Sequence, residues 1–134
     1  MKHPSMLTVT SLLSILLFLF HLTGDIIRGI EPGTLTNLPA VPIMVVWLCG
    51  ALLLAERRSG QVIMLIGALF AAAVPVLHLR GRGVGGAFAQ SSGAFLFIWT
   101  LFALGATGTF SVILAVRALR SRQSGQQGSA ATRT

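Results

Sequence analysis

Four long apolar segments alternate with short polar connections along the chain. They span residues 6–23, 38–55, 61–79 and 93–116, and none of them carries a charged side chain. At a rise of 1.5 Å per residue, 18 to 20 helical residues span roughly 27–30 Å, which is the thickness of the hydrocarbon core of a bilayer. None of the segments shows the apolar–polar alternation of a barrel strand. The pattern therefore predicts four membrane-spanning α-helices.

Composition supports a membrane protein and argues against a soluble domain. The chain has 134 residues, of which 54% are hydrophobic and 10% charged, whereas soluble domains carry about 25% charged residues. We expect an all-α integral membrane four-helix bundle made of two helical hairpins. The four-helix domain is expected to cover residues 1–120. Residues 121–134 are expected to form a disordered cytoplasmic tail because they lack apolar surface.

The basic residues divide unequally between the two ends of the predicted bundle. Seven lie at the end that also holds both termini: Lys2, Arg57, Arg58, Arg117, Arg120, Arg122 and Arg133. Three lie at the other end: Arg28, Arg80 and Arg82. The excess of Lys and Arg predicts that both termini are cytoplasmic, in a bacterial inner (plasma) membrane. The formal net charge is +7, but the basic residues lie between the apolar runs and form no basic stripe. No nucleic-acid partner is therefore expected.

The three connections differ in kind. Residues 56–60 predict a tight turn. Residues 24–37 predict a short structured excursion that extends the first helix by about a turn. Residues 80–92, with four glycines between and beside two arginines, predict a mobile loop because glycine adds backbone freedom.

Small residues recur in the third and fourth segments at spacings that allow two helices to approach closely. They are Gly67, Ala71 and Pro75 in the third segment, and Gly105, Gly108 and Thr109 in the fourth. Pro75 is expected to kink or break its helix. The lipid bilayer is the expected partner. The sequence leaves open whether these faces pack within the chain, against a second copy in a homo-oligomer, or against a partner membrane subunit.

Two histidines end segments that run in the same direction. His21 closes the first segment and His78, 57 residues later, closes the third, each followed by Leu and, two positions further on, by Gly. The same offset lays residues 38–55 over residues 95–112, so the two hairpins could have arisen by internal duplication. With or without duplication, both histidines are predicted at the extracytoplasmic boundary of the membrane.

Charged residues surround these histidines. Asp25 and Arg28 follow His21 at i+4 and i+7, which places the three on one helical face. The candidate polar cluster comprises His21, Asp25, Arg28, Glu31, His78, Arg80 and Arg82. We expect Asp25 to pair with Arg82 or Arg80, and His21, Asp25 and His78 to approach within direct or water-mediated contact.

Three interpretations of this cluster stay open at this point. The first is a solvated polar rim. The second is a metal or haem site, in which His21, His78 and Asp25 hold a divalent ion or the two histidines ligate haem. The third is a proton-coupled or anion-recognising site. The first fits a non-enzymatic small membrane protein, either a subunit or a handler of small solutes. The alternative is a metal- or haem-binding protein or enzyme. The catalytic residues of such an enzyme cannot be named from the sequence.

Overall fold

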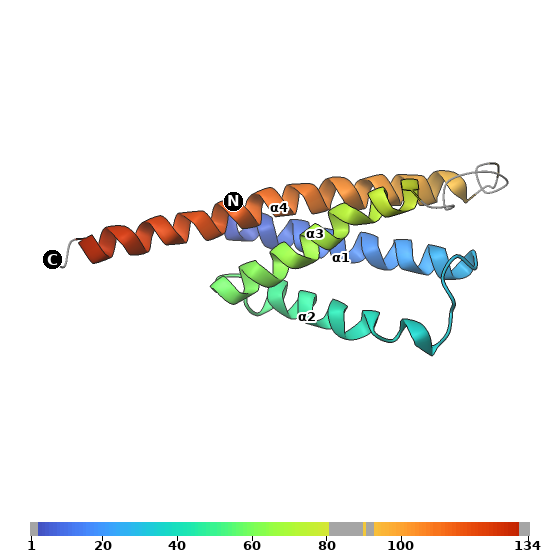
Figure 1. The fold of residues 1–134 in the computed structure, drawn as a ribbon, viewed down its shortest axis with the longest axis horizontal. Helices are drawn as coiled ribbons and strands as arrows, with labels where there is room; N and C mark the ends of the chain where they lie inside the picture. The colour runs from blue at the N-terminus through green and yellow to red at the C-terminus, as the bar shows by residue number, and fades with distance from the viewer. Residues whose placement is uncertain (1–2, 81–89, 91–92, 132–134) are drawn as a thin grey trace.

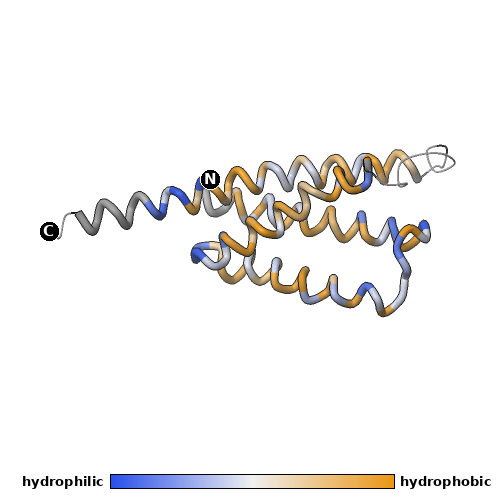
Figure 2. Tube along the Cα trace, viewed as in Figure 1, coloured by the Kyte–Doolittle hydropathy of each residue, from blue (hydrophilic) through white to orange (hydrophobic). Residues whose placement is uncertain are grey.

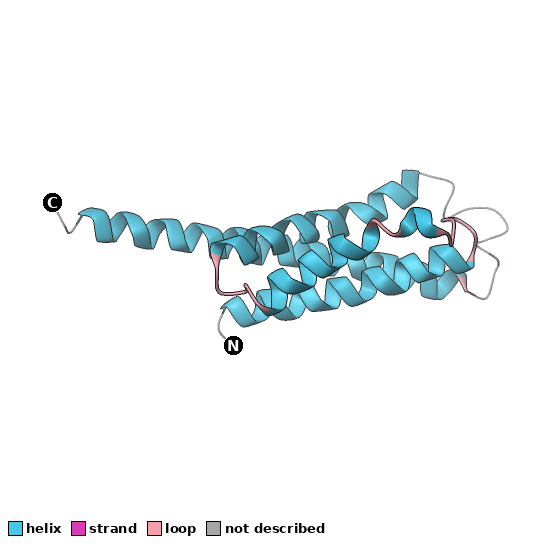
Figure 3. Ribbon diagram, turned by 90° about the horizontal axis from the view of Figure 1, so that it is seen from below, coloured by secondary structure: helices cyan, strands magenta, loops and turns pink. Residues whose placement is uncertain are grey.

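A computed structural model describes residues 3–80, 90 and 93–131, and they form a helical bundle (Figure 1). The elements are α1 (His3–Ile27), the short 3-10 helix η1 (Leu35–Asn37), α2 (Ala40–Leu52), α3 (Arg58–Arg80) and α4 (Ala94–Ala131). In Figure 1, α1 and α3 run one way and α2 and α4 run the other. Figure 3 shows that no strand interrupts this arrangement among the described residues.

Each of the four predicted spans is confirmed as a helical stretch long and apolar enough to cross a membrane. The stretches are Met6–Ile27, Leu35–Leu52, Arg58–Leu79 and Ala94–Gln123. Their outward faces are apolar, as Phe102 (55% exposed) and Ile66 (63% exposed) illustrate. Hydrophobic residues cover the helices in Figure 2, and hydrophilic ones gather at the connections and where α4 leaves the bundle. Such a surface suits lipid better than water.

The ends of the helices differ from the expected limits. α1 continues to Ile27, which agrees with the predicted extra turn, and α3 begins at Arg58, before the expected residue 61. α4 is helical to Ala131, although residues 121–134 were expected to be disordered. Once a long helix exists, each further residue adds a backbone hydrogen bond at little cost. A shortage of apolar side chains therefore removes packing partners without ending the helix.

Several expectations fall on residues outside the described part of the chain. These are the mobile loop, of which residues 81–89 and 91–92 are not described, and the ion pair between Asp25 and Arg82. Internal duplication also stays a prediction. The two hairpins are unequal in length, since α2 has 13 residues and α4 has 38.

α4 packs along both α3 and α1, and glycines allow the closest approach. A Cβ on Gly108 would lie 2.7 Å from the backbone nitrogen of Ala72, and one on Gly105 would lie 2.6 Å from Pro75 Cγ. The sequence left open where these small faces pack, and the structure places Gly105 and Gly108 against α3 of the same chain. α3 stays helical through Pro75. Gly67 instead makes room for the Trp47 ring of α2, which is 2.3 Å from where its Cβ would be.

A hydroxyl pair joins α1 to α4 inside the bundle. Ser14 Oγ lies 3.1 Å from Thr107 Oγ1 and 2.9 Å from the carbonyl oxygen of Thr10, so its single proton is shared between these two acceptors. Thr107 donates its own proton to the carbonyl of Ala103. Ser11 and Ser111 are fully buried on the same two helices. Because serine is small, these positions allow α1 and α4 to lie close together.

Enlarging Gly108 is expected to separate α3 from α4. We predict that Gly108→Val lowers the free energy of unfolding by about 1–3 kcal/mol, the usual cost of overpacking, measured by thermal denaturation in detergent. Ala106→Val, at an exposed position one half-turn away, is the matched control and should melt like the unmodified protein. Equal melting of the two variants would contradict the close contact.

Candidate metal centre

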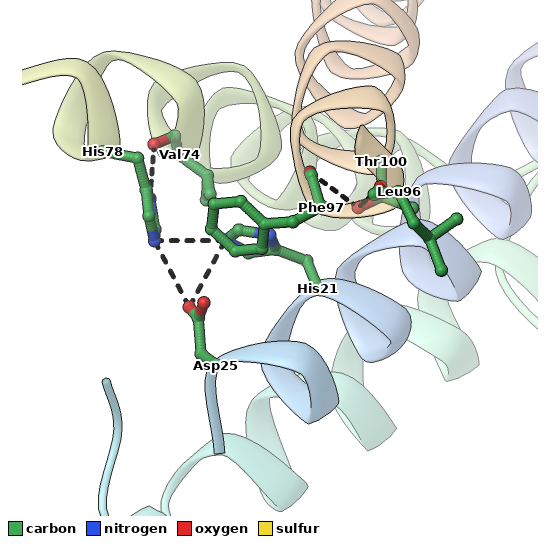
Figure 4. A network of polar contacts seen from close by, with 7 residues as sticks. All are labelled: His21, Asp25, Val74, His78, Leu96, Phe97 and Thr100. Atoms are coloured by element: carbon green, nitrogen blue, oxygen red, sulfur yellow. Dashed lines mark hydrogen bonds and ion pairs between the residues drawn. The ribbon is translucent and has the colours of Figure 1, made fainter. Parts of the chain in front are cut away.

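The side chains of His21, Asp25 and His78 meet between α1 and α3 (Figure 4). His21 Nε2 lies 3.2 Å from His78 Nε2. Asp25 Oδ2 lies 3.2 Å from His78 Nε2 and 3.4 Å from His21 Nε2. The predicted convergence of these three residues is confirmed. We refer to them as the triad.

The end of α1 is fixed by a glycine cap just beyond Asp25. Gly29 adopts a positive φ of 70°, its N–H donates to the carbonyl of Ile26 across 3.0 Å, and Ile30 N–H donates to the carbonyl of Asp25 across 2.9 Å. This pair of bonds is the Schellman motif, in which glycine accepts the left-handed conformation without steric cost. The cap holds Asp25 in the last turn, where i, i+4 spacing places it beside His21.

The hydrogen bonds of His78 determine which of its nitrogens carries a proton. Its Nδ1 lies 3.0 Å from the carbonyl oxygen of Val74, and a carbonyl can only accept. Nδ1 therefore carries a proton and, in the neutral ring, Nε2 presents a lone pair toward the triad. A metal-ligating histidine is usually oriented in this way by a hydrogen bond from its other nitrogen.

The triad as a whole has too few protons for its acceptors. The Asp25 carboxylate and the neutral His78 Nε2 both present lone pairs, so a neutral His21 can supply at most one proton to the three facing atoms. Asp25 Oδ1 and His21 Nδ1 are buried and have no hydrogen-bond partner among the described residues. A buried carboxylate in this situation needs positive charge nearby. The guanidinium of Arg28, whose charge acts on His21, supplies part of it, and a proton on an imidazole or a metal ion would supply more.

The triad is enclosed except at His78. His21 is 2% exposed and Asp25 is 4% exposed, whereas the His78 side chain is 19% exposed. Phe97 of α4, which is 2% exposed, closes one side, with its ring centroid 4.9 Å from that of His21 and 5.8 Å from that of His78. A water molecule or an ion therefore reaches the triad by passing the partly exposed His78 imidazole.

Arg28 holds Phe97 and the start of α4 against the end of α1. Its guanidinium carbon lies 4.6 Å from the Phe97 ring centroid, and its Nη2 donates to the carbonyl of Gly93 across 3.0 Å. Gly24 leaves space for it, since a Cβ there would lie 2.8 Å from Arg28 Nη1. Arg28 thus acts as a support for the wall of the site, with its charge against an aromatic face.

The position of the triad along the helices follows from residue counts. About 20 residues separate His78 from Arg58 on α3, and about 20 separate Phe97 from Arg117 on α4. Each interval corresponds to about 30 Å of helix, the thickness of the hydrocarbon core. If the arginines lie at one boundary of the membrane, the triad lies at the opposite one.

Two helix ends also favour a cation at this position. Asp25 lies in the last turn of α1, and His78 lies in the last turn of α3. The unpaired carbonyls at helix C-termini carry partial negative charge, which attracts cations and disfavours a carboxylate. A cation at the triad would offset both the Asp25 charge and these dipoles.

Among the described residues, the rest of the predicted polar cluster supplies no ligand atom to the triad, although the charge of Arg28 acts on His21. Glu31 is exposed in the connection after α1, and Arg28 lies against Phe97. Arg80 is the last residue of α3, where only its backbone is described, and Arg82 is outside the described residues. Sequence reasoning missed Phe97, Val74 and Gly93. Phe97 is one of eight phenylalanines, and no sequence signal distinguishes the one that faces the histidines.

The triangle of ligand atoms matches the face of a tetrahedral metal site. For Zn²⁺, bonds of about 2.0–2.1 Å imply separations of about 3.3–3.4 Å between neighbouring ligand atoms, compared with about 2.9 Å for an octahedral ion with the same bonds. The observed separations are 3.2, 3.2 and 3.4 Å. Haem does not fit, because two axial imidazoles need about 4 Å between their nitrogens and a porphyrin between them.

Comparison of the chain with protein-family models, with curated proteins and with solved structures gave no match. The chemistry of the triad is therefore inferred from its geometry.

Removing the Phe97 ring is expected to open the triad and leave a cavity. We predict that Phe97→Ala lowers the free energy of unfolding by about 3 kcal/mol, as for other buried aromatic residues, measured by thermal or denaturant unfolding in detergent. Phe95→Ala is the matched control, because Phe95 lies on the same helix and is 78% exposed. A loss of similar size in both variants would argue against Phe97 as a wall of the site.

Proposed function

We propose that this chain is a multi-pass protein of a bacterial-type inner membrane that binds one divalent transition-metal ion at the triad. The observation that carries the proposal is the triangle of His21 Nε2, His78 Nε2 and Asp25 Oδ2, with edges of 3.2–3.4 Å and too few protons to link its acceptors. Both termini are placed in the cytoplasm by the excess of Lys and Arg at their end of the bundle. The triad then lies at the extracytoplasmic end.

Zn²⁺ is the ion that the geometry favours, because two imidazoles and one carboxylate are ligands it accepts in tetrahedral sites. Fe²⁺ is the second candidate, since the same ligand types form the facial triad of non-haem iron proteins, which is octahedral. Three protein ligands leave one tetrahedral position for water or another molecule. The partial exposure of His78 gives the ion a path in from the extracytoplasmic side.

This proposal develops the alternative interpretation of the sequence, a metal-binding membrane protein that uses His21, His78 and Asp25. Intramembrane ionisable residues that face a bundle interior usually mark ion or substrate sites. Next to the triad, the buried apolar side chains of Phe18, Leu101 and Leu104 separate it from the buried hydroxyls of Ser14 and Ser11 further along the bundle. Binding from one side, as in a metal receptor or store, fits this arrangement better than a continuous path.

Zinc binding is the direct test. After treatment with a chelator, the protein in detergent is titrated with Zn²⁺ by calorimetry, and bound metal is counted by mass spectrometry. We expect one ion per chain, and a loss of affinity of more than about 100-fold in His21→Ala, His78→Ala and Asp25→Asn, since even outer-shell changes cost 10–100-fold. Zn²⁺ at 100 times its Kd should stabilise the protein by about 2.7 kcal/mol.

The third histidine of the chain provides the matched control. His3→Ala removes an imidazole from the other end of α1 and should bind Zn²⁺ as the unmodified protein does. Failure of the unmodified protein to take up Zn²⁺, Co²⁺ or Fe²⁺, with triad variants that are equally stable, would reject the proposal in favour of a polar rim. Equal loss in His3→Ala would show that uptake is non-specific.

Orientation is tested separately from metal binding. Fusions of alkaline phosphatase, which is active only outside the cytoplasm, are made after Thr134 and within residues 81–89. We predict activity for the fusion within residues 81–89 and none for the fusion at the C-terminus. The reverse pattern would place the triad on the cytoplasmic side.

A further inference from the structure

Five arginines form a second charged region, at the opposite end of the bundle from the triad. We call them the arginine collar: Arg57, Arg58, Arg117, Arg120 and Arg122, all of them exposed. The guanidinium of Arg122 donates a hydrogen bond to the carbonyl of Glu56. This bond brings the arginines that precede and begin α3 beside those on α4, although about 60 residues separate the two groups.

The collar is thin along the bundle and wide around it. Residues 117 to 122 cover about 7.5 Å of α4, which is comparable to the headgroup layer that adds about 5–8 Å to each side of the hydrocarbon core. At 100° per residue, Arg122 points about 140° away from Arg117 around the helix axis. Arg57 and Arg58 extend the ring of charge to the α2–α3 turn.

We propose that the arginine collar binds the phosphate groups of anionic phospholipids in the membrane leaflet on its side of the bundle. Guanidinium groups bind phosphate oxygens through paired hydrogen bonds, and basic clusters next to membrane helices attract anionic lipids. A single compact anion would require the arginines to converge. The collar spreads them in one plane, so it matches a surface of many headgroups.

The layout of the bundle supports this choice. The collar lies about 30 Å of helix away from the triad level, as counted on α3 and on α4, so both ends meet the boundaries of one hydrocarbon core. Glu56 is the only acidic residue close to the collar in the sequence. The five arginines and Glu56 therefore carry a combined formal charge of +4.

The test measures lipid preference in the full chain. The protein is incubated in micelles that contain equal amounts of phosphatidylglycerol and phosphatidylcholine, and the retained lipids are counted by native mass spectrometry. We expect at least twofold enrichment of phosphatidylglycerol. Arg117→Gln/Arg120→Gln and Arg57→Gln/Arg58→Gln should each reduce it, whereas Arg117→Lys/Arg120→Lys, which keeps the charge, should retain most of it. Each variant is first required to melt like the unmodified protein in phosphatidylcholine alone.

Two results would overturn the inference. One is equal retention of both lipids by the unmodified protein. The other is stabilisation by inorganic phosphate in phosphatidylcholine that matches the effect of phosphatidylglycerol, because it would show a site for a small free anion. The inference does not depend on the triad, so loss of lipid preference and loss of zinc binding can be observed independently.

Discussion

A carboxylate closed off from water must be matched by a positive charge, and Asp25 imposes this condition on the end of the bundle where the triad lies. Its side chain is 6% exposed, and its Oδ2 faces two imidazoles. His78 cannot donate to it while neutral, because its one proton is on the Nδ1 that bonds to Val74. The glycine cap of α1, the tilt of the His78 ring toward Val74 and the placement of Phe97 all keep this charge enclosed. This end of the bundle is therefore arranged around an enclosed carboxylate.

Helix contacts away from the triad affect how closely Phe97 and the two imidazoles approach one another. α3 carries His78 and α4 carries Phe97, so the contact of Gly105 and Gly108 with α3 sets how closely the aromatic wall approaches the imidazoles. Ser14 and Thr107 set the corresponding distance between α4 and α1. Small side chains far from the triad thus determine its dimensions. In a membrane, where lipid is as apolar as the helices, such van der Waals fits replace hydrophobic collapse.

Much of this arrangement could be predicted from the sequence, because it depends on one-dimensional signals. Runs without charge located the four helices, and the shared position of His21 and His78 at the ends of parallel segments indicated their convergence. The i+4 spacing added Asp25. The contacts of Arg28 with Phe97 and Gly93 could not be foreseen, since they depend on how α4 rotates against α1. The helical continuation of α4 to Ala131 was missed because composition reports packing partners and carries little information on backbone propagation.

The division of the triad among the helices also has a consequence for biosynthesis. His21 and Asp25 are synthesised early, on α1, while His78 emerges more than 50 residues later and Phe97 later still, because chains are synthesised from the N-terminus. During that interval the carboxylate has only one imidazole beside it. The three ligand residues can meet once α3 has been made, and Phe97 can close the site only once α4 follows, so the enclosure of the carboxylate is the last step to be completed.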